Sequence, residues 1–280
     1  RASQLGMKVA CIEKQPTLGG TCLNVGCIPS KALLNASEHF ANAASGTLGK
    51  LGISVGSVAL DLKQMMQSKS DVVDTLTGGI DFLFKKNKIT RLEGSATLTG
   101  AGSVTIVDGK DKGDYKAGKI MIATGSLPSS LPGITIDEKH IVSSTGALSL
   151  ETLPKKMVVI GAGCIGLELG TVWARLGAEV EVIEFLPRIL PGMDAEIAKK
   201  FMTIAKKQGL KFRLSTAVKS AKVGKNGVSL TVTSANGDDE ETVKADIALV
   251  SVGRHPATDG LGLEKIGVTM TPRGRIAVDA

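Results

Sequence analysis

Two cysteines, Cys22 and Cys27, stand five positions apart, directly after a glycine pair and ahead of a helix-forming stretch. Residues five apart in a regular helix rise about 7.5 Å along its axis, more than the roughly 7 Å between Cα atoms that a disulfide tolerates. A bridge therefore requires a distorted helix start, for which Gly26 supplies backbone freedom and Pro29 removes an amide. The pattern predicts a strained, reducible disulfide at a helix N-terminus, where Lys31 would stabilise a thiolate.

Two other interpretations of this pair stay open: buried structural cysteines, or half of a zinc site. A zinc site requires a second ligand pair at metal spacing, which we do not find, so we predict no metal. Cys11 and Cys164 are interpreted as small packed residues. Four cysteines in a chain of this length, without a visible secretory signal, indicate a reducing compartment.

The clearest binding signal is a glycine pattern that follows the short apolar stretch 157–160. Gly161 permits a tight turn, Gly163 lets the backbone approach a pyrophosphate, and Gly166 lets a helix pack closely on the strand. The phosphates would lie at the positive end of that helix, which we expect to run through Ala174. The alternative is a glycine-rich turn without a ligand.

A second strand, predicted over 179–184, supports the ligand-binding interpretation because it ends in Glu184. A carboxylate at this place hydrogen-bonds a ribose hydroxyl. When the start of the chain is shifted by 171 positions, Glu13 falls on Glu184, which indicates an internal repeat. The matching glycine turn would precede residue 1, so we expect a chain truncated at its N-terminus and two dinucleotide sites. Apolar strands predicted at 119–123 and 247–252 would each end near one ligand.

Composition excludes several classes of protein. Hydrophobic residues make up 42% and charged residues 22% of the chain, which is typical of soluble globular proteins. The length of 280 residues predicts two domains. The apolar stretch 157–174 contains Glu168 and four glycines, so we reject a membrane span. The net charge of +7 comes from scattered lysine pairs without interleaved aromatic residues, so we predict no nucleic-acid binding.

Other elements are predicted more coarsely. We expect a helical stretch from Ser30 to Lys88, a short strand at 103–107 among glycine-punctuated hairpins, and a connector at 126–154.

The wording of residues 19–31, Gly-Gly-Thr-Cys-Leu-Asn-Val-Gly-Cys-Ile-Pro-Ser-Lys, resembles the pyridine nucleotide-disulfide oxidoreductases, and the resemblance covers essentially the whole chain. It implies an α/β fold with two Rossmann-like dinucleotide-binding domains, the FAD domain being interrupted by the NAD domain. The FAD domain would take residues 1–150, the NAD domain 151–270, and residues 271–280 would return to the FAD domain. Compared with the family, the first glycine turn and the C-terminal interface domain are absent.

The resemblance also implies residue roles. Cys22 and Cys27 would form the redox-active disulfide, with Cys27 nearer the flavin, and Lys31 would stabilise charge beside it. FAD would be held by Glu13, the turn Lys14 to Cys22 with Gly19, Gly20 and Thr21, and by Lys31, Gly94, Thr124, Gly125 and Ser126. NAD would be held by Gly161, Ala162, Gly163, Cys164, Ile165, Gly166, Leu167, Glu168, Glu184, Val218 and Gly253.

The implied reaction is the oxidation of dihydrolipoamide by NAD, because residues 19–31 are most similar to the branch that performs it. NADP-dependent disulfide and mercuric reductases of the family carry arginines after the second strand, whereas here Arg188 is the only nearby basic residue. A carboxylate at Glu184 repels the extra phosphate, which favours NAD. An NADPH-dependent reductase and a non-catalytic nucleotide-binding scaffold remain the alternatives.

The resemblance further implies lipoyl domains of 2-oxoacid dehydrogenase complexes or of the glycine cleavage system as partners, and a homodimer in the full-length protein. It places the enzyme in the mitochondrial matrix of a eukaryote or the cytoplasm of a bacterium. The family's catalytic histidine and glutamate lie in the absent domain, and His39, His140 and His255 do not fit that role. We therefore expect this chain alone to be inactive.

Overall fold

The computed structural model describes residues 1–234, 237 and 239–279. The chain forms two compact units. The first unit contains Arg1–Asn24, Val73–Leu127 and His255–Ala280, and the second contains Val25–Val72 and Pro128–Arg254. The first unit is thus interrupted in sequence by the second, and each contains parallel strands, which confirms the predicted fold class.

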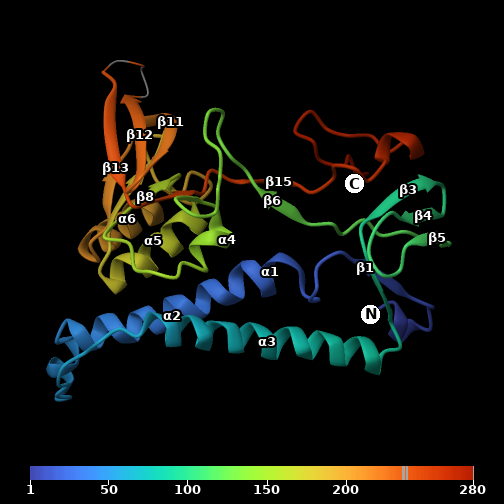
Figure 1. The fold of residues 1–280 in the computed structure, drawn as a ribbon, viewed down its shortest axis with the longest axis horizontal. Coiled ribbons are helices and arrows are strands. Elements are labelled where there is room, and N and C mark those ends of the chain that lie inside the picture. Colours follow the sequence, from blue (N-terminus) through green and yellow to red (C-terminus); the bar gives the residue numbers. More distant parts are fainter. Residues whose placement is uncertain (235–236, 238, 280) are drawn as a thin grey trace. The chain divides into compact units, whose positions relative to one another are not determined.

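The second unit, in which Figure 1 labels strand β8, is built on a parallel sheet of five strands. In spatial order these are β10 (Lys211–Arg213), β9 (Glu179–Ile183), β8 (Lys156–Ile160), β14 (Ile247–Val250) and β7 (Ile141–Val142). An antiparallel sheet of β11 (Thr216–Gly224), β12 (Gly227–Ser234) and β13 (Glu241–Ala245) belongs to the same unit. Its helical segments are α2 (Cys27–Ala44), η2 (Thr47–Leu51), α4 (Ser144–Ala147), α5 (Cys164–Leu176) and α6 (Ala195–Lys207).

Strand β8 shows why its sequence is continuously apolar. Met157 and Val159 belong to one buried cluster, whereas Val158 and Ile160 belong to another that includes residues of β12 and β13. Alternate side chains of a strand point to opposite faces, so a strand covered on both faces must be apolar throughout. The stretch 157–160 is therefore a central sheet strand, as predicted.

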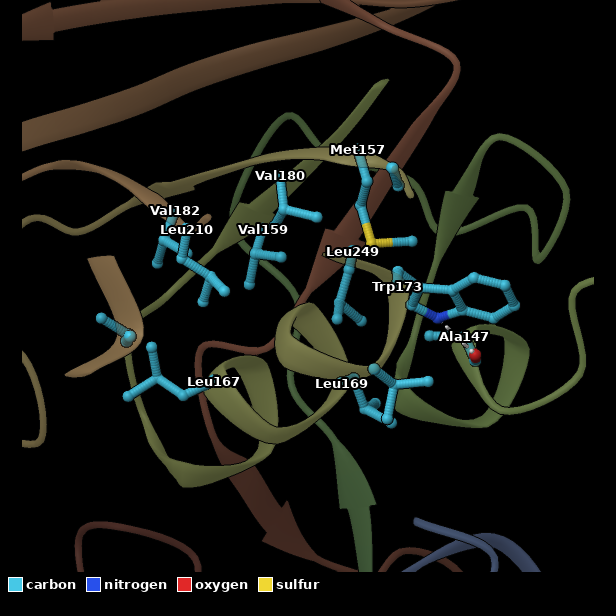
Figure 2. Packing of buried hydrophobic residues seen from close by; sticks show 14 of the residues in the cluster. Ala147, Met157, Val159, Leu167, Leu169, Trp173, Val180, Val182, Leu210 and Leu249 are labelled. Atoms are coloured by element: carbon cyan, nitrogen blue, oxygen red, sulfur yellow. Dashed lines mark hydrogen bonds between the residues drawn. The ribbon is translucent and has the colours of Figure 1, made fainter. Parts of the chain in front are cut away.

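The first of these clusters joins the sheet to α5 (Figure 2). Trp173, the single tryptophan of the chain, is fully buried there, and its Nε1–H donates to the carbonyl oxygen of Ala147 at 3.1 Å. Leu33 of α2 is also fully buried in this cluster. Helix α2 therefore belongs to the same compact unit as α5, although we assigned residues 1–150 to one domain. The two compact units have other boundaries than the predicted cofactor-binding domains. The domain limits at residues 150 and 270 therefore stay predictions.

The first unit has a parallel pair, β1 (Ala10–Glu13) with β2 (Thr90–Glu93), and an antiparallel sheet of three strands. The antiparallel strands are β3 (Ala96–Gly100), β4 (Ser103–Ile106) and β5 (Gly113–Lys116), which match the predicted hairpins. Short 3-10 helices lie at η1 (Ser3–Leu5) and η3 (Leu263–Ile266). Strands β6 (Ser126–Pro128) and β15 (Arg254–Pro256) form a two-stranded sheet.

One predicted element is confirmed only in part, and another is wrong. The predicted helical stretch from Ser30 to Lys88 contains two helices, α2 and α3 (Leu62–Lys86), which are separated by η2 and residues without regular structure. Gly46 and Gly52, with φ of +70° and +78°, bound η2 in the left-handed conformation that ends helices. The predicted strand at 119–123 is irregular, and Met121 is 88% exposed, because no described strand pairs with this segment.

Candidate functional site: the nucleotide turn and the cysteine helix

The glycine turn connects β8 to α5 within the second unit. Gly161 follows β8 with φ of +101°, and a Cβ atom there would lie 2.7 Å from the carbonyl oxygen of Ser251. Gly163 caps α5 in an extended conformation, with φ of −77° and ψ of 175°. The turn therefore needs glycine at its first position for both conformation and space.

The other two glycines of the motif serve different purposes. A Cβ atom on Gly166 would overlap the carbonyl oxygen of Gly161 and Oγ of Ser251, and would lie 2.9 Å from Cγ1 of Val159. Gly163, in contrast, has nothing within 4 Å of where its Cβ would be. Gly166 is thus required for close packing of α5 on the sheet, whereas the space beside Gly163 at the N-terminus of α5 is open. The pyrophosphate site there stays a prediction.

Glu184 lies directly after β9 and is 9% exposed. One carboxylate oxygen accepts the N–H of Ala162 at 2.7 Å, and the other accepts the N–H of Leu186 at 2.9 Å. The nearby cation Arg188 donates to the carbonyl oxygen of Pro191 in its own loop. The carboxylate is therefore held at the glycine turn, and the guanidinium is occupied within its own loop.

An ion pair joins α2, which begins at Cys27, to α5, which follows the glycine turn. Nζ of Lys31 on α2 lies 2.7 Å and 2.8 Å from the two carboxylate oxygens of Glu168 on α5. The hydroxyl of Ser30, itself buried, donates to the same carboxylate at 2.8 Å. Glu168, predicted as an NAD-binding residue, is thus engaged with the helix that begins at Cys27.

The hydrogen bond from Glu168, together with its charge, raises the pKa of Lys31, and the neighbouring sulfurs of Cys27 and Cys164 act in the same direction while burial opposes it. Lys31 therefore stays a cation. Because the side chain of Lys31 is 58% exposed and that of Glu168 33%, solvent weakens the pair, and its contribution to stability is small.

The two cysteines lie on different helices. Cys22 is in the short helix α1 (Gly20–Val25), and Cys27 is the first residue of α2. Gly26 between them has φ of −140° and ψ of −119°, outside the helical region. The prediction that one distorted helix start carries both cysteines is corrected: the helix is broken at Gly26, since glycine has the freedom to leave helical geometry. Both cysteines are exposed, and the disulfide stays a prediction.

Asn24 and Arg91 support the turn that precedes α1, and the sequence did not single out either. Asn24 accepts the hydroxyl of Thr17 at 2.6 Å and donates to the carbonyl oxygen of Gly20 at 3.0 Å. The guanidinium of Arg91 on β2 donates to the carbonyl oxygens of Gln15 and Pro16 at 3.2 Å and 2.7 Å. Polar side chains that satisfy loop carbonyls hold a turn in one conformation.

Several residues predicted to bind FAD meet within the first unit. The N–H of Gly94 donates to the carbonyl oxygen of Glu13 at 3.2 Å. A Cβ on Gly125 would lie 4.0 Å from Oγ1 of Thr21. Gly94, with φ of +151°, also lies so close to the carbonyl of Asp108 that no side chain would fit. Their binding roles stay predictions.

The remaining predicted residues are described by their place in the chain. Ser126 begins β6, and Thr124 and Gly125 precede it in irregular backbone. Val218 stands at a register shift in β11, and Gly253, with φ of +125°, follows β14. No contact among the described residues assigns these positions a ligand.

The internal repeat extends further than the sequence comparison detected. Glu13 accepts the N–H of Gln15 at 2.8 Å, just as Glu184 accepts that of Leu186. Glu13 is the last residue of β1 and Glu184 comes directly after β9. Each of these strands pairs in parallel with a later strand, β2 or β10, and an antiparallel three-stranded sheet comes next. The two units therefore share this order of strands, which extends the internal repeat that the match of Glu13 to Glu184 indicated.

Two further observations bear on the chemistry. Among the residues that the structure describes, no group of three or more His, Cys, Asp or Glu side chains is arranged to hold a metal ion. Over the same residues, no helix has the length and apolar character needed to cross a membrane.

Comparison with known proteins defines the class. The family model described as pyridine nucleotide-disulphide oxidoreductase matches residues 1–280. The chain therefore belongs to this family, as the resemblance of residues 19–31 implied.

The relatives narrow the class further. The chain is 51% identical over 278 residues to dihydrolipoyl dehydrogenase 3 of Pseudomonas aeruginosa, with 99% of this chain and 59% of the relative covered. It is 49% identical over 282 residues to the mitochondrial dihydrolipoyl dehydrogenase of Schizosaccharomyces pombe, with 100% and 55% covered. The solved HOCl-induced flavoprotein disulfide reductase RclA from Escherichia coli has a TM-score of 0.83 at 28% identity, covering 99% of this chain and 58% of that one. The chain thus spans between half and three fifths of the length of these relatives.

Proposed function

We propose that this chain is the cofactor-binding part of a dihydrolipoyl dehydrogenase, which oxidises dihydrolipoamide with NAD through FAD and a cysteine pair. The observation that carries the proposal is the Lys31–Glu168 pair, which ties the helix beginning at Cys27 to the helix that follows the glycine turn. A direct connection between a thiol redox site and a nucleotide site favours an enzyme that passes electrons from one to the other over a non-catalytic scaffold. The relatives named dihydrolipoyl dehydrogenase, which are 51% and 49% identical to this chain, support dihydrolipoamide as the substrate.

The residues present fit NAD, and those that meet in the first unit would form part of an FAD site. Gly163 leaves open space before α5, whose first N–H groups have no helical acceptor, and this suits a pyrophosphate. Glu184 would accept a ribose hydroxyl of NAD, together with the other predicted residues from Gly161 to Glu168, Val218 and Gly253. FAD would be held by Glu13, the turn from Lys14 to Cys22, Lys31, Gly94 and residues 124–126.

In the proposed reaction a dihydrolipoamide thiolate attacks the sulfur of Cys22 in the Cys22–Cys27 disulfide, and Cys27 leaves as a thiolate. The second substrate thiol, after losing its proton, attacks the mixed disulfide, releasing oxidised lipoamide and the Cys22 thiolate. The flavin that these residues would hold would supply the two-electron chemistry that connects the Cys22–Cys27 dithiol to NAD. Lys31 stabilises the negative charge that develops beside Cys27.

Glu184 is proposed to select NAD over NADP. Its buried carboxylate would face and repel the 2′-phosphate of NADP, and Arg188 is the only nearby basic residue in the sequence. Lipoyl domains of 2-oxoacid dehydrogenase complexes or of the glycine cleavage system are the proposed partners, and a homodimer the proposed state of the full-length protein. The mitochondrial and bacterial relatives support a matrix location in eukaryotes and a cytoplasmic one in bacteria.

The test is a full-length protein that contains this chain. We expect a flavin absorption spectrum that changes on adding dihydrolipoamide and is restored by NAD but not by NADP. Reduction by NADPH in place of NADH would favour the alternative reductase. A protein without bound flavin, or one whose spectrum ignores thiols and nucleotides, would favour a non-catalytic scaffold.

A further inference from the structure

We propose that Glu184 is also a positioning residue, which shapes the glycine turn before any nucleotide binds. The inference rests on the proposed nucleotide site and deepens it. The turn is tied at three points to the last residue of β9 and the segment that follows it. Gly161 N–H donates to the Ile183 carbonyl at 2.8 Å, Ala162 N–H to Oε2 of Glu184 at 2.7 Å, and Leu190 N–H to the Ala162 carbonyl at 3.0 Å.

Among these three bonds, only the one from Ala162 N–H to Glu184 depends on a side chain. Ala162 is fully buried, so without the carboxylate its N–H would lose its acceptor in a place that water does not reach. A buried N–H without an acceptor is unfavourable, and a bond to a carboxylate is stronger than one to a neutral group. Loss of the carboxylate would therefore make the turn shift to find another acceptor.

A shift of the turn matters for binding because Gly163 and the first residues of α5 follow Ala162 directly. Their N–H groups have no acceptor inside the helix, and the direction in which they point is set by the turn. Glu184 would thus influence pyrophosphate binding without touching a phosphate.

The same carboxylate can still accept a ribose hydroxyl. Each of its oxygens has two lone pairs, and the backbone bonds from Ala162 and Leu186 use one on each. Substitution would remove both functions, so the experiment must separate the ribose contact from the shape of the turn.

The separation uses ADP and 2′,3′-dideoxy-ADP, which share the pyrophosphate but differ in the ribose hydroxyls. Calorimetry on the 280-residue chain would compare the parent with Glu184→Ala and Glu184→Gln, which remove the same charge. Glutamine keeps one acceptor oxygen and should partly rescue the turn. Glu179→Ala is the matched control, since it removes a carboxylate at the other end of β9, where Glu179 pairs with exposed Lys211.

We expect Glu184→Ala to weaken binding of dideoxy-ADP about fivefold, the size of a modest coupling between sites, with Glu184→Gln in between and Glu179→Ala unchanged. Removing a negative charge should by itself favour an anionic ligand, so a loss of affinity cannot be electrostatic. In the ligand-free protein, hydrogen exchange at the Ala162 amide should accelerate roughly tenfold in Glu184→Ala. Melting temperatures would show whether the variants fold. If Glu184→Ala does not fold, the comparison of Glu184→Gln with the parent decides the test.

If Glu184 only contacts the ribose, dideoxy-ADP binds the parent and Glu184→Ala equally and the Ala162 amide exchanges at its parental rate. Either result overturns the positioning role while leaving the nucleotide site intact. A parent chain that binds neither ADP nor NADH contradicts the nucleotide site itself, and both proposals fall.

Discussion

Gly166→Ala is predicted to destabilise the second unit, although alanine is the better helix former. The added methyl group would overlap the carbonyl oxygen of Gly161 and Oγ of Ser251. Neither can move freely, because that carbonyl is main chain and the Ser251 hydroxyl donates to the carbonyl of Ile160 at 3.0 Å. Helix α5 must therefore move away from β8, or the turn must distort.

The magnitude follows from comparison with Gly170→Ala on the same helix. A Cβ at Gly170 would lie 3.4 Å from Cγ2 of Val159 and from Cγ1 of Val180, which is ordinary van der Waals contact. Both substitutions gain about 1 kcal/mol of helix propensity, so the difference between them isolates the steric cost. Overpacking a core by one methyl group costs about 1–3 kcal/mol, and we expect Gly166→Ala to be less stable than Gly170→Ala by about 2 kcal/mol.

The assay is thermal and urea unfolding of the parent and both variants, followed by circular dichroism and by the emission of Trp173. For a unit of this size, 1 kcal/mol corresponds to about 2–4 °C in melting temperature, so the two variants should differ by about 4–8 °C. Gly170→Ala should equal or exceed the parent. NADH binding should weaken in Gly166→Ala and persist in Gly170→Ala.

Equal stability of the two variants would refute the reasoning, because it would mean that α5 accommodates a methyl group against β8 without cost. A destabilised Gly170→Ala would also count against it, since ordinary contact distances would then be no guide to the cost.

Three further outcomes are expected. Tagging of free thiols before and after mild reduction should show a gain of two, at Cys22 and Cys27; no gain would exclude a redox pair. Lys31→Met should lower stability slightly at neutral pH. Because the hydrogen bond to Glu168 raises the pKa of Lys31 in the folded state, the difference from the parent should be lost as the pH rises through that raised pKa; a pH-independent difference in melting temperature would contradict this. Trp173→Phe should cost about 1–3 kcal/mol, measured by urea unfolding, because it leaves the buried carbonyl of Ala147 without its donor; unchanged stability would show that another donor replaces the indole.

The glycine turn and its acid could be predicted from the sequence because each depends on local rules. A strand of four apolar residues, a positive-φ glycine and a carboxylate at the end of the next strand carry their own signatures. The structure places Gly161 at φ of +101° and Glu184 directly after β9, as predicted, and it adds the hydrogen bond from Ala162 to Glu184, which the spacing did not predict. The family could be recognised for the same reason, because the glycine turn and the cysteine segment 19–31 are local patterns that together indicated it, and the family model matches residues 1–280.

The repeat of the first strand was detectable for the same reason. Glu13 and Glu184 each end a strand and accept the amide two residues later. The sequence could not reveal that Gly94 donates to Glu13 or that Arg91 holds the carbonyls of Gln15 and Pro16, because these partners are more than seventy residues apart in the chain.

The tertiary structure decided where the helices belong. The stretch at 119–123 has the residues of a strand but no described partner, and without a hydrogen-bonding ladder an apolar run has no reason to be extended and paired. Helix α2 follows the cysteines in sequence, yet Leu33 is buried with the residues of α5, and Lys31 and Ser30 reach Glu168, 137 and 138 positions away. Which helix packs on which, and therefore which acid meets which cation, depends on the burial of apolar faces between distant segments, and no local pattern contains that information.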